Sequence, residues 1–179
     1  MDNFLLIAIN TDVMPLRTAL QRNPDLWGAN SVRQDFANSP HADVRDILLR
    51  FSDTSASNIG DQLVCSSMPA LAQLPEARPL IHGLLARVNA TMLGRVLITR
   101  LPAGKSIKPH RDVLGAYAHH YQRYHIPLQS LPGCSFCAGG EHVFMKPGEV
   151  WWFNASVDHE VVNNSADDRI HLIIDARSD

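Results

Sequence analysis

Three side chains in the C-terminal half of the sequence have the types and spacing of a metal-ligand set. His110 and Asp112 form a His-x-Asp pair, and His159 follows 47 residues after Asp112. Two imidazoles and one carboxylate can cap one face of a divalent metal ion and leave the opposite face open, which is the ligand set of non-heme Fe(II) sites that activate oxygen. The pattern therefore predicts an oxygenase. The alternative is that both histidines are ordinary polar residues near turns.

The elements around these residues must bring them together. Residues i and i+2 of a strand lie on one face, so a strand at this point would direct His110 and Asp112 toward one ion. Arg169 comes 10 residues after His159 and is the next candidate. A planar guanidinium meets a carboxylate through two parallel hydrogen bonds and stays cationic when enclosed, so Arg169 is predicted to hold an organic acid. A surface salt bridge with Asp167 or Asp168 is the alternative.

The chain after Gly94 consists of short apolar runs separated by Pro, Gly and Asn turns, which is typical of antiparallel strands. Seven strands at this spacing predict a mainly β fold with flanking helices, built on a double-stranded β-helix, or jelly-roll, core. The expected strands are 95–101, 121–128, 135–137, 142–145, 150–153, 159–163 and 169–175. We expect one domain over residues 1–179, with 94–176 as the core and 1–93 as mixed α/β support.

The N-terminal half predicts two helices and one ambiguous segment. Residues 12–22 carry apolar side chains at helical spacing, with Thr11 as the expected N-cap and Pro24 as the stop. Residues 76–93 predict an amphipathic helix that Gly94 would end. Residues 43–51 fit a strand or a helix, and the polar residues 52–61 predict a loop.

Several motifs in order across residues 94–175 carry a family resemblance. They are Lys108-Pro-His-Arg-Asp112, Arg123-Tyr-His-Ile-Pro-Leu128, Pro147-Gly-Glu-Val-Trp-Trp-Phe153, Asp158-His-Glu160 and Asp168-Arg-Ile-His-Leu-Ile-Ile-Asp175. Together they resemble the aspartyl/asparaginyl β-hydroxylase family of Fe(II)- and 2-oxoglutarate-dependent dioxygenases. The animal protein hydroxylases of that family lack the acidic ligand, whereas this chain keeps Asp112. The likeness is therefore to the bacterial branch, which includes free amino acid hydroxylases such as proline cis-hydroxylases.

The resemblance implies roles for individual residues. His110, Asp112 and His159 correspond to the iron ligands, and Arg169 to the partner of the distal 2-oxoglutarate carboxylate. The family's Arg-x-His pair, which also contacts the cosubstrate, matches Arg123 and His125, with support of the barrel mouth as the alternative. Thr99 stands eleven residues before His110, where the family places a hydroxyl near the distal carboxylate.

The resulting hypothesis is a hydroxylase that uses Fe(II), 2-oxoglutarate and O2 and releases succinate and CO2. Its expected substrate is an amino acid or an amino acid side chain in a peptide or protein. A small metabolite remains a further option, because substrate groups in this fold come from variable loops. Four arginines are candidates for a substrate carboxylate, with a solvated surface charge as the alternative for each: Arg33, Arg45, Arg50 and Arg111. Two rivals remain open: a non-catalytic cupin-like binding module, and a Zn(II) or Mn(II) isomerase or hydrolase.

Composition excludes several other classes. The net charge of −2 and the lack of a basic stripe argue against nucleic-acid binding. The apolar run 5–9 is too short to span a bilayer and lacks the features of a secretory signal. Three cysteines favour a reducing compartment, so we expect a cytoplasmic protein. Cys134 and Cys137 form a lone Cys-x-x-Cys, which is read as two half-buried thiols on opposite strand faces rather than a zinc site.

Overall fold

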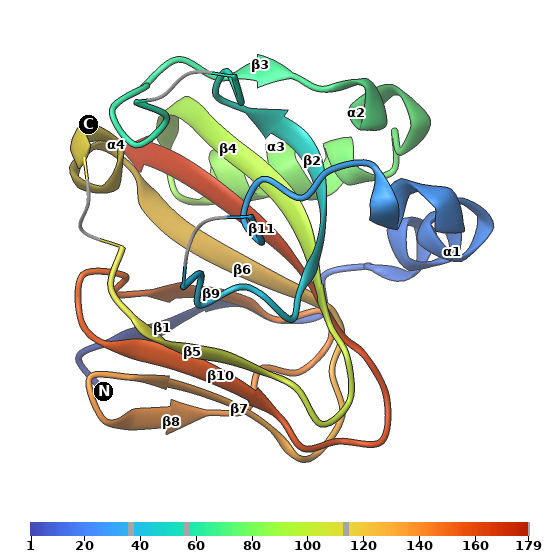
Figure 1. The fold of residues 1–179 in the computed structure, drawn as a ribbon, viewed down its shortest axis with the longest axis vertical. Coiled ribbons are helices and arrows are strands. Elements are labelled where there is room, and N and C mark those ends of the chain that lie inside the picture. Colours follow the sequence, from blue (N-terminus) through green and yellow to red (C-terminus); the bar gives the residue numbers. More distant parts are fainter. Residues whose placement is uncertain (36–37, 56–57, 113–114, 179) are drawn as a thin grey trace.

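The computed structural model describes residues 1–35, 38–55, 58–112 and 115–178, which form two antiparallel sheets packed face to face (Figure 1). The larger sheet has the strand order β1-β9-β6-β11-β4-β2-β3, and the smaller sheet has the order β5-β10-β7-β8. This arrangement confirms the predicted jelly-roll core. The strands are β1 (Phe4–Ala8), β2 (Arg45–Phe51), β3 (Ser66–Ser67), β4 (Ala90–Leu101), β5 (Ser106–His110), β6 (Gln122–Gln129), β7 (Cys134–Ala138), β8 (Glu141–Val143), β9 (Val150–Phe153), β10 (His159–Asn163) and β11 (Arg169–Ser178).

The alternation of side chains along the strands divides the larger sheet into two different faces. On β4, Val96 and Ile98 are fully buried in a cluster that also contains helix residues. The intervening residues Arg95, Leu97 and Thr99 face the smaller sheet and the cavities between the two sheets. One face of the sheet is thus held by apolar packing, and the other carries the polar residues of the candidate site.

The helices cover the apolar face or lie at the edges of the sheets (Figure 1). They are α1 (Met14–Arg22), the 3₁₀ helix η1 (Pro24–Gly28), α2 (Pro69–Gln73), α3 (Ala77–Arg87) and α4 (Gly115–His120). Leu16 of α1 and Leu84 of α3 are buried in the same apolar cluster as the larger sheet. In the described residues no helix is both long and apolar enough to cross a bilayer.

The predicted helix over 76–93 is too long. Helix α3 ends at Arg87, and Asn89 has a positive φ of 51°, a left-handed conformation that ends a helix as glycine often does. Strand β4 then begins at Ala90, so Gly94 lies inside a strand rather than at a helix end. The apolar spacing of 88–93 fitted a helix, but antiparallel pairing of Met92 and Leu93 with β11 decides the outcome.

Other differences from the expected elements lie mostly in the N-terminal half. Helix α1 begins at Met14 and not at Asp12, and Thr11 does not cap it; instead the Asp12 carboxylate accepts a hydrogen bond from the Met14 amide at 3.1 Å. The ambiguous segment is a strand, β2. Strands β1 and β3, the 3₁₀ helix η1 and helices α2 and α4 were not expected from the sequence, because short segments take their structure from tertiary pairing. The strand assumed at His110 is present as β5, but it ends before Asp112.

Gly94 provides a test of how β4 and α4 are packed. A Cβ atom at this position would lie 2.5 Å from the Tyr117 hydroxyl and 3.0 Å from Tyr121 Cδ1. We expect Gly94→Ala to lower the free energy of unfolding by about 1–3 kcal/mol, because α4 must move away from β4. Urea unfolding measures this effect. Gly83 on α3 is the matched control: no atom lies within 4 Å of its added Cβ, so Gly83→Ala should be neutral or stabilising by about 1 kcal/mol. Equal effects of the two changes would contradict the packing described here.

Candidate metal centre

The three candidate ligands come from the ends of two neighbouring strands of the smaller sheet. His110 is the last residue of β5, His159 is the first residue of β10, and the two are paired directly across the strands. Asp112 lies two residues beyond His110, outside the strand, where its amide donates a hydrogen bond of 2.9 Å to the Ala155 carbonyl. The backbone therefore places all three side chains at one end of the sandwich. The expectation that His110 and Asp112 share one strand was wrong, because β5 ends at His110.

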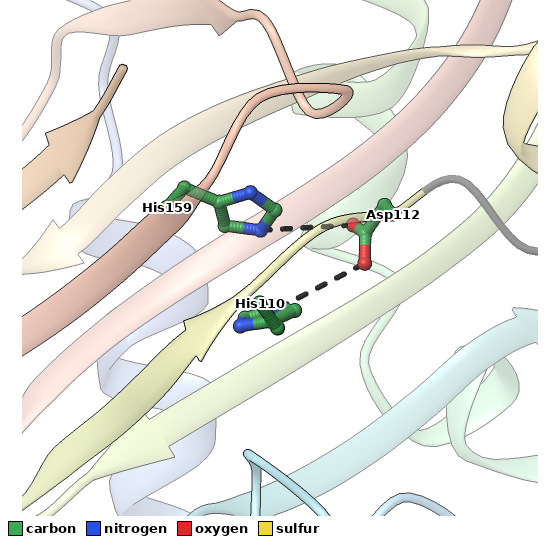
Figure 2. Close-up of side chains that lie close together, drawn as sticks. All are labelled: His110, Asp112 and His159. Carbon is green, nitrogen blue, oxygen red and sulfur yellow. Dashed lines mark ion pairs between the residues drawn. The ribbon is translucent and has the colours of Figure 1, made fainter. Parts of the chain in front are cut away.

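Figure 2 shows the three side chains pointing toward one another. Their ligand atoms all lie within 4.8 Å of one another. His110 Nε2 is 3.8 Å from Asp112 Oδ1, and His159 Nε2 is 4.0 Å from Asp112 Oδ2. Distances of this size between donor atoms leave room for one ion with bonds of about 2.0–2.2 Å. Among the described residues this is the one group of three His, Cys, Asp or Glu side chains with such geometry.

Both imidazoles are set to present Nε2 as a ligand atom. The Nδ1 atoms of His110 and His159 lie 2.7 Å and 3.0 Å from the carbonyl oxygens of Lys108 and Val157. Because a carbonyl only accepts, each Nδ1 must carry the proton, which leaves the Nε2 lone pair free. Burial lowers the pKa of His110 below its usual value and that of His159 to about 4. Both rings are therefore neutral at pH 7, which is the form that binds metals.

The carboxylate ligand is ionised and is held by Arg123. Burial alone would raise the pKa of Asp112, but the nearby basic groups, with Arg123 contributing most, together outweigh burial and lower it. Arg123 Nη1 donates a hydrogen bond to Asp112, while its Nε and Nη2 donate to Asp175 at 2.8 Å and 2.9 Å. Asp175 also accepts a hydrogen bond from the Tyr117 hydroxyl at 3.0 Å. The predicted cosubstrate residue Arg123 thus lies at the centre and orients Asp112.

Arg169 is buried in the larger sheet, with 3% of its surface exposed, and has no carboxylate partner in the described part of the chain. The alternative of a surface salt bridge is not observed, since Asp168 lies 3.7 Å from Arg100 instead. Burial lowers the pKa of Arg169 to about 10, so the guanidinium is still charged at pH 7. A buried cation without a counter-ion is unfavourable, and an anionic ligand would remove that cost.

The two histidines next to Arg169 form a short chain with it. Arg169 Nη2 lies 3.1 Å from His171 Nδ1, and His125 Nδ1 lies 3.2 Å from the same atom. Since a guanidinium only donates, His171 Nδ1 is the acceptor, and its proton is on Nε2, which is buried and has no hydrogen-bond partner among the described residues. Burial holds the pKa of both histidines well below the usual value. The chain is therefore neutral apart from Arg169.

Because His125 and His171 are buried in the neutral form, the stability of the folded protein should depend on pH. As pH falls below about 6.5, the unfolded chain protonates His171 but the folded protein does not, so the free energy of unfolding falls by about 1.4 kcal/mol per pH unit for each such histidine. We expect His171→Gln to make the decline between pH 6 and pH 4.5 shallower by about that amount. Urea unfolding at a series of pH values measures it. His82→Gln, at an exposed position on α3, is the control. If the free energy of unfolding of His171→Gln falls with pH as steeply as that of the wild type, His171 is not neutral in the folded protein.

Thr99 lies in the same region and is linked to the N-terminal half. Its hydroxyl donates a hydrogen bond of 2.7 Å to Asp46 and accepts one of 3.2 Å from Arg33. Arg33 Nη2 also lies 2.8 Å from His41 Nδ1, and the His41 ring packs edge-on against His110 with 4.7 Å between ring centres. Asp46 and His41 were not predicted as site residues. No spacing rule connects them with the jelly-roll motifs, because the contact depends on the loop that precedes β2.

Two adjoining cavities that share several lining residues surround this site. A narrow cleft is lined by His110, His159, Thr99, His125 and Arg169. A larger cavity of about 470 Å³ begins at His110 and Asp112 and extends toward Arg95 and α4. Arg33, His41 and Arg123 line both, so they mark the boundary between the two. The metal centre thus lies where a buried cationic cleft meets a wider cavity.

The remaining candidates from the sequence lie elsewhere or have partners of their own. Arg111 forms two hydrogen bonds of 2.6 Å with Asp158 at the rim, and Arg45 and Arg50 bond to backbone carbonyls. Cys134 is buried and donates to Asn163 at 3.1 Å, while Cys137 is only partly buried, as expected for opposite faces of a strand.

Comparisons with known proteins point to one family. The family model described as aspartyl/asparaginyl beta-hydroxylase matches residues 60–178. L-proline cis-4-hydroxylase of Rhizobium meliloti (strain 1021) is 28% identical over 117 residues, which are 64% of this chain and 41% of that protein. The chain thus spans less than half the length of this curated relative.

Two solved structures share the fold. A prolyl-4-hydroxylase of Pseudomonas putida superposes with a TM-score of 0.52 at 15% identity, covering 100% of this chain and 94% of that one. An oxidoreductase of the 2OG-Fe(II) oxygenase family from Burkholderia pseudomallei gives 0.54 at 15% identity, covering 74% and 65%. Since the family model covers more than half of the chain, the chain belongs to the aspartyl/asparaginyl beta-hydroxylase family.

Proposed function

We propose that this chain is an Fe(II)- and 2-oxoglutarate-dependent dioxygenase that hydroxylates an amino acid or an amino acid side chain in a peptide or protein, with succinate and CO2 as coproducts. The observation that supports this most strongly is the pairing of a two-histidine, one-carboxylate site with a buried, unpaired guanidinium in the adjoining cleft. A cupin-like binding module or a zinc or manganese hydrolase would need the metal ligands but would not need the buried guanidinium.

The residues of the site fit the iron and the cosubstrate chemically. His110, Asp112 and His159 would hold Fe(II) through two neutral imidazoles and one ionised carboxylate. Arg169 would hold the distal carboxylate of 2-oxoglutarate, with the Thr99 hydroxyl and His125 lining the same cleft. When bound, iron and 2-oxoglutarate supply with O2 the oxidising chemistry that converts an unactivated C–H bond to an alcohol.

The contribution of the chain is orientation and the exclusion of water. Arg123 fixes the Asp112 carboxylate, and Asp175 in turn fixes Arg123 through two hydrogen bonds. The cleft beside Arg169 has a volume of only about 30 Å³. This is room for no more than a few water molecules, so entry of a five-carbon diacid requires the boundary residues Arg33 and His41 to move. Their movement would also open the cleft to the wider cavity.

Succinate formation from 2-oxoglutarate tests the proposal. The assay supplies Fe(II), ascorbate and air and screens the twenty amino acids and short peptides for an increase in turnover coupled to hydroxylated product. We expect at least one amino acid or peptide to stimulate succinate release. A protein that binds Fe(II) but neither binds nor consumes 2-oxoglutarate would contradict the proposal and favour the binding module.

A further inference from the structure

Of the described residues that line the larger cavity, one arginine forms no ion pair with a carboxylate. Four arginines line the cavity, and three of them are paired: Arg33 with Asp46, Arg111 with Asp158, and Arg123 with Asp175 and Asp112. Among the described residues no carboxylate oxygen lies within 4.0 Å of Arg95. Arg95 is therefore the cation in this cavity that is available to an anionic ligand.

The position of Arg95 is fixed by its surroundings. Its Nε donates to the Ser52 hydroxyl at 3.0 Å, and its Nη2 donates to the Ile59 carbonyl at 2.5 Å. The guanidinium carbon lies 3.8 Å from the centre of the Tyr117 ring and 4.7 Å from that of Phe51. Nη1 has no hydrogen-bond partner in the described part of the chain. A rigid guanidinium with a free N–H edge is suited to bind a carboxylate.

Arg95 and Arg169 must serve different anions. Arg169 is paired with Leu101 on β4, six residues from Arg95. At about 3.3 Å per residue, this places the two backbone positions roughly 20 Å apart along the strand. Arg169 lines the narrow cleft and not the larger cavity, whereas Arg95 lines the larger cavity and not the cleft. A diacid held by Arg169 in the cleft therefore leaves Arg95 available to a second anion.

Within the described part of the chain, the larger cavity offers no free carboxylate for a positively charged amine. The acidic residues that line it are Asp112 and Asp175. Asp112 belongs to the metal centre, and Asp175 accepts two hydrogen bonds from Arg123 and one from Tyr117. An ammonium group placed here would lose its hydration without gaining a counter-ion.

The other walls of the cavity are largely apolar, with Phe51, Ile59, Leu97, Tyr121 and Ile173 among the lining residues. We infer that the substrate is an amino acid with an acylated nitrogen, an apolar side chain and a free carboxylate, and that Arg95 holds this carboxylate. This inference rests on the proposed function and narrows its substrate class, since it disfavours free zwitterionic amino acids.

Four matched ligands with one apolar body test the inference by calorimetric titration. They are L-leucine, N-acetyl-L-leucine, 4-methylpentanoate and 3-methylbutylamine, added to protein loaded with Mn(II) as a redox-inert ion. We expect N-acetyl-L-leucine and 4-methylpentanoate to bind at least about tenfold more tightly than L-leucine, and the amine to show no binding. The inference is wrong if L-leucine binds as tightly as N-acetyl-L-leucine and 4-methylpentanoate, or if neither of these two ligands binds.

Two arginines on the same strand provide the matched variants. Arg95→Gln should weaken carboxylate binding by about tenfold or more, and Arg95→Lys should restore part of it. Arg100→Gln is the control, because Arg100 also stacks on an aromatic ring, Trp27, but does not line the cavity. Thermal unfolding of each variant separates loss of binding from loss of fold. Unchanged affinity in folded Arg95→Gln would overturn the assignment.

Titrations with and without 2-oxoglutarate separate this inference from the proposed function. Failure of 2-oxoglutarate to bind counts against the proposed function alone, because the probes report on the larger cavity in either case. Binding of 2-oxoglutarate together with a preference for L-leucine or the amine would leave the proposed function intact and overturn the inference alone.

Discussion

His159→Ala is expected to abolish metal-dependent turnover, with a fall in the rate of succinate formation of about 1,000-fold or more, equivalent to about 4 kcal/mol. His159 is 5% exposed and supplies one of three donor atoms, so water cannot replace it with the same geometry. Asp112→Ala should have a similar effect, because it also leaves Arg123 without one of its two carboxylate partners. Steady-state kinetics with Fe(II) and 2-oxoglutarate measure both.

The control for this prediction is another histidine of the smaller sheet. His142 lies on β8, exposed, with its Nδ1 3.2 Å from the Ser135 hydroxyl, and it is outside both cavities. His142→Ala should retain full activity. Turnover that persists in both His159→Ala and Asp112→Ala would remove the metal assignment.

Arg169→Met is expected to have opposite effects on binding and on stability. The KM for 2-oxoglutarate should rise by about 100-fold, equivalent to about 2.7 kcal/mol, because the distal carboxylate loses its cationic partner. The ligand-free protein should become more stable by about 1–3 kcal/mol, because an apolar side chain of similar volume replaces a buried, unpaired charge. Kinetics and urea unfolding of the ligand-free protein measure the two effects.

Arg169→Lys distinguishes charge from geometry in the same experiment. Lysine keeps the positive charge but cannot form two parallel hydrogen bonds, so its KM should lie between those of the wild type and Arg169→Met. An unchanged KM in Arg169→Met would show that another group holds the cosubstrate.

The sequence was sufficient to predict the jelly-roll core and the convergence of the three candidate metal ligands. The strands after Gly94 alternate and are separated by strong turn signals, so β9 and β10 were predicted with their observed bounds. The proximity of His110, Asp112 and His159 was also predictable, because these residues stand in ordered motifs at strand ends. The buried environment of Arg169 agrees with the role inferred for a guanidinium at that position.

Other features depend on contacts that no local pattern encodes. Helix α3 ends early because Asn89 turns the chain and β4 pairs with β11 along its whole length, and helical spacing in 88–93 was not a sufficient guide. Arg123 was expected to contact the cosubstrate, but in the structure its side chain bonds to Asp112, which follows β5, and to Asp175 on β11. The role of Arg123 toward 2-oxoglutarate therefore remains a prediction.

The contribution of the N-terminal half was the hardest to foresee. Arg33 was one of four arginine candidates, and sequence alone did not distinguish it from Arg45. In the structure Arg33 reaches Thr99 and His41 at the boundary of the two cavities, whereas Arg45 is exposed. The difference arises from the packing of the loop before β2 over the open face of the larger sheet.

Anaerobic titration of 2-oxoglutarate into Fe(II)-loaded protein tests most directly whether the His110, Asp112 and His159 site and the Arg169 cleft act as one centre. We expect binding that requires the metal, that produces a visible charge-transfer band, and that is lost in both Asp112→Ala and Arg169→Met. Binding of 2-oxoglutarate that is equally tight without metal, or unaffected by either substitution, would contradict the coupling of the two sites.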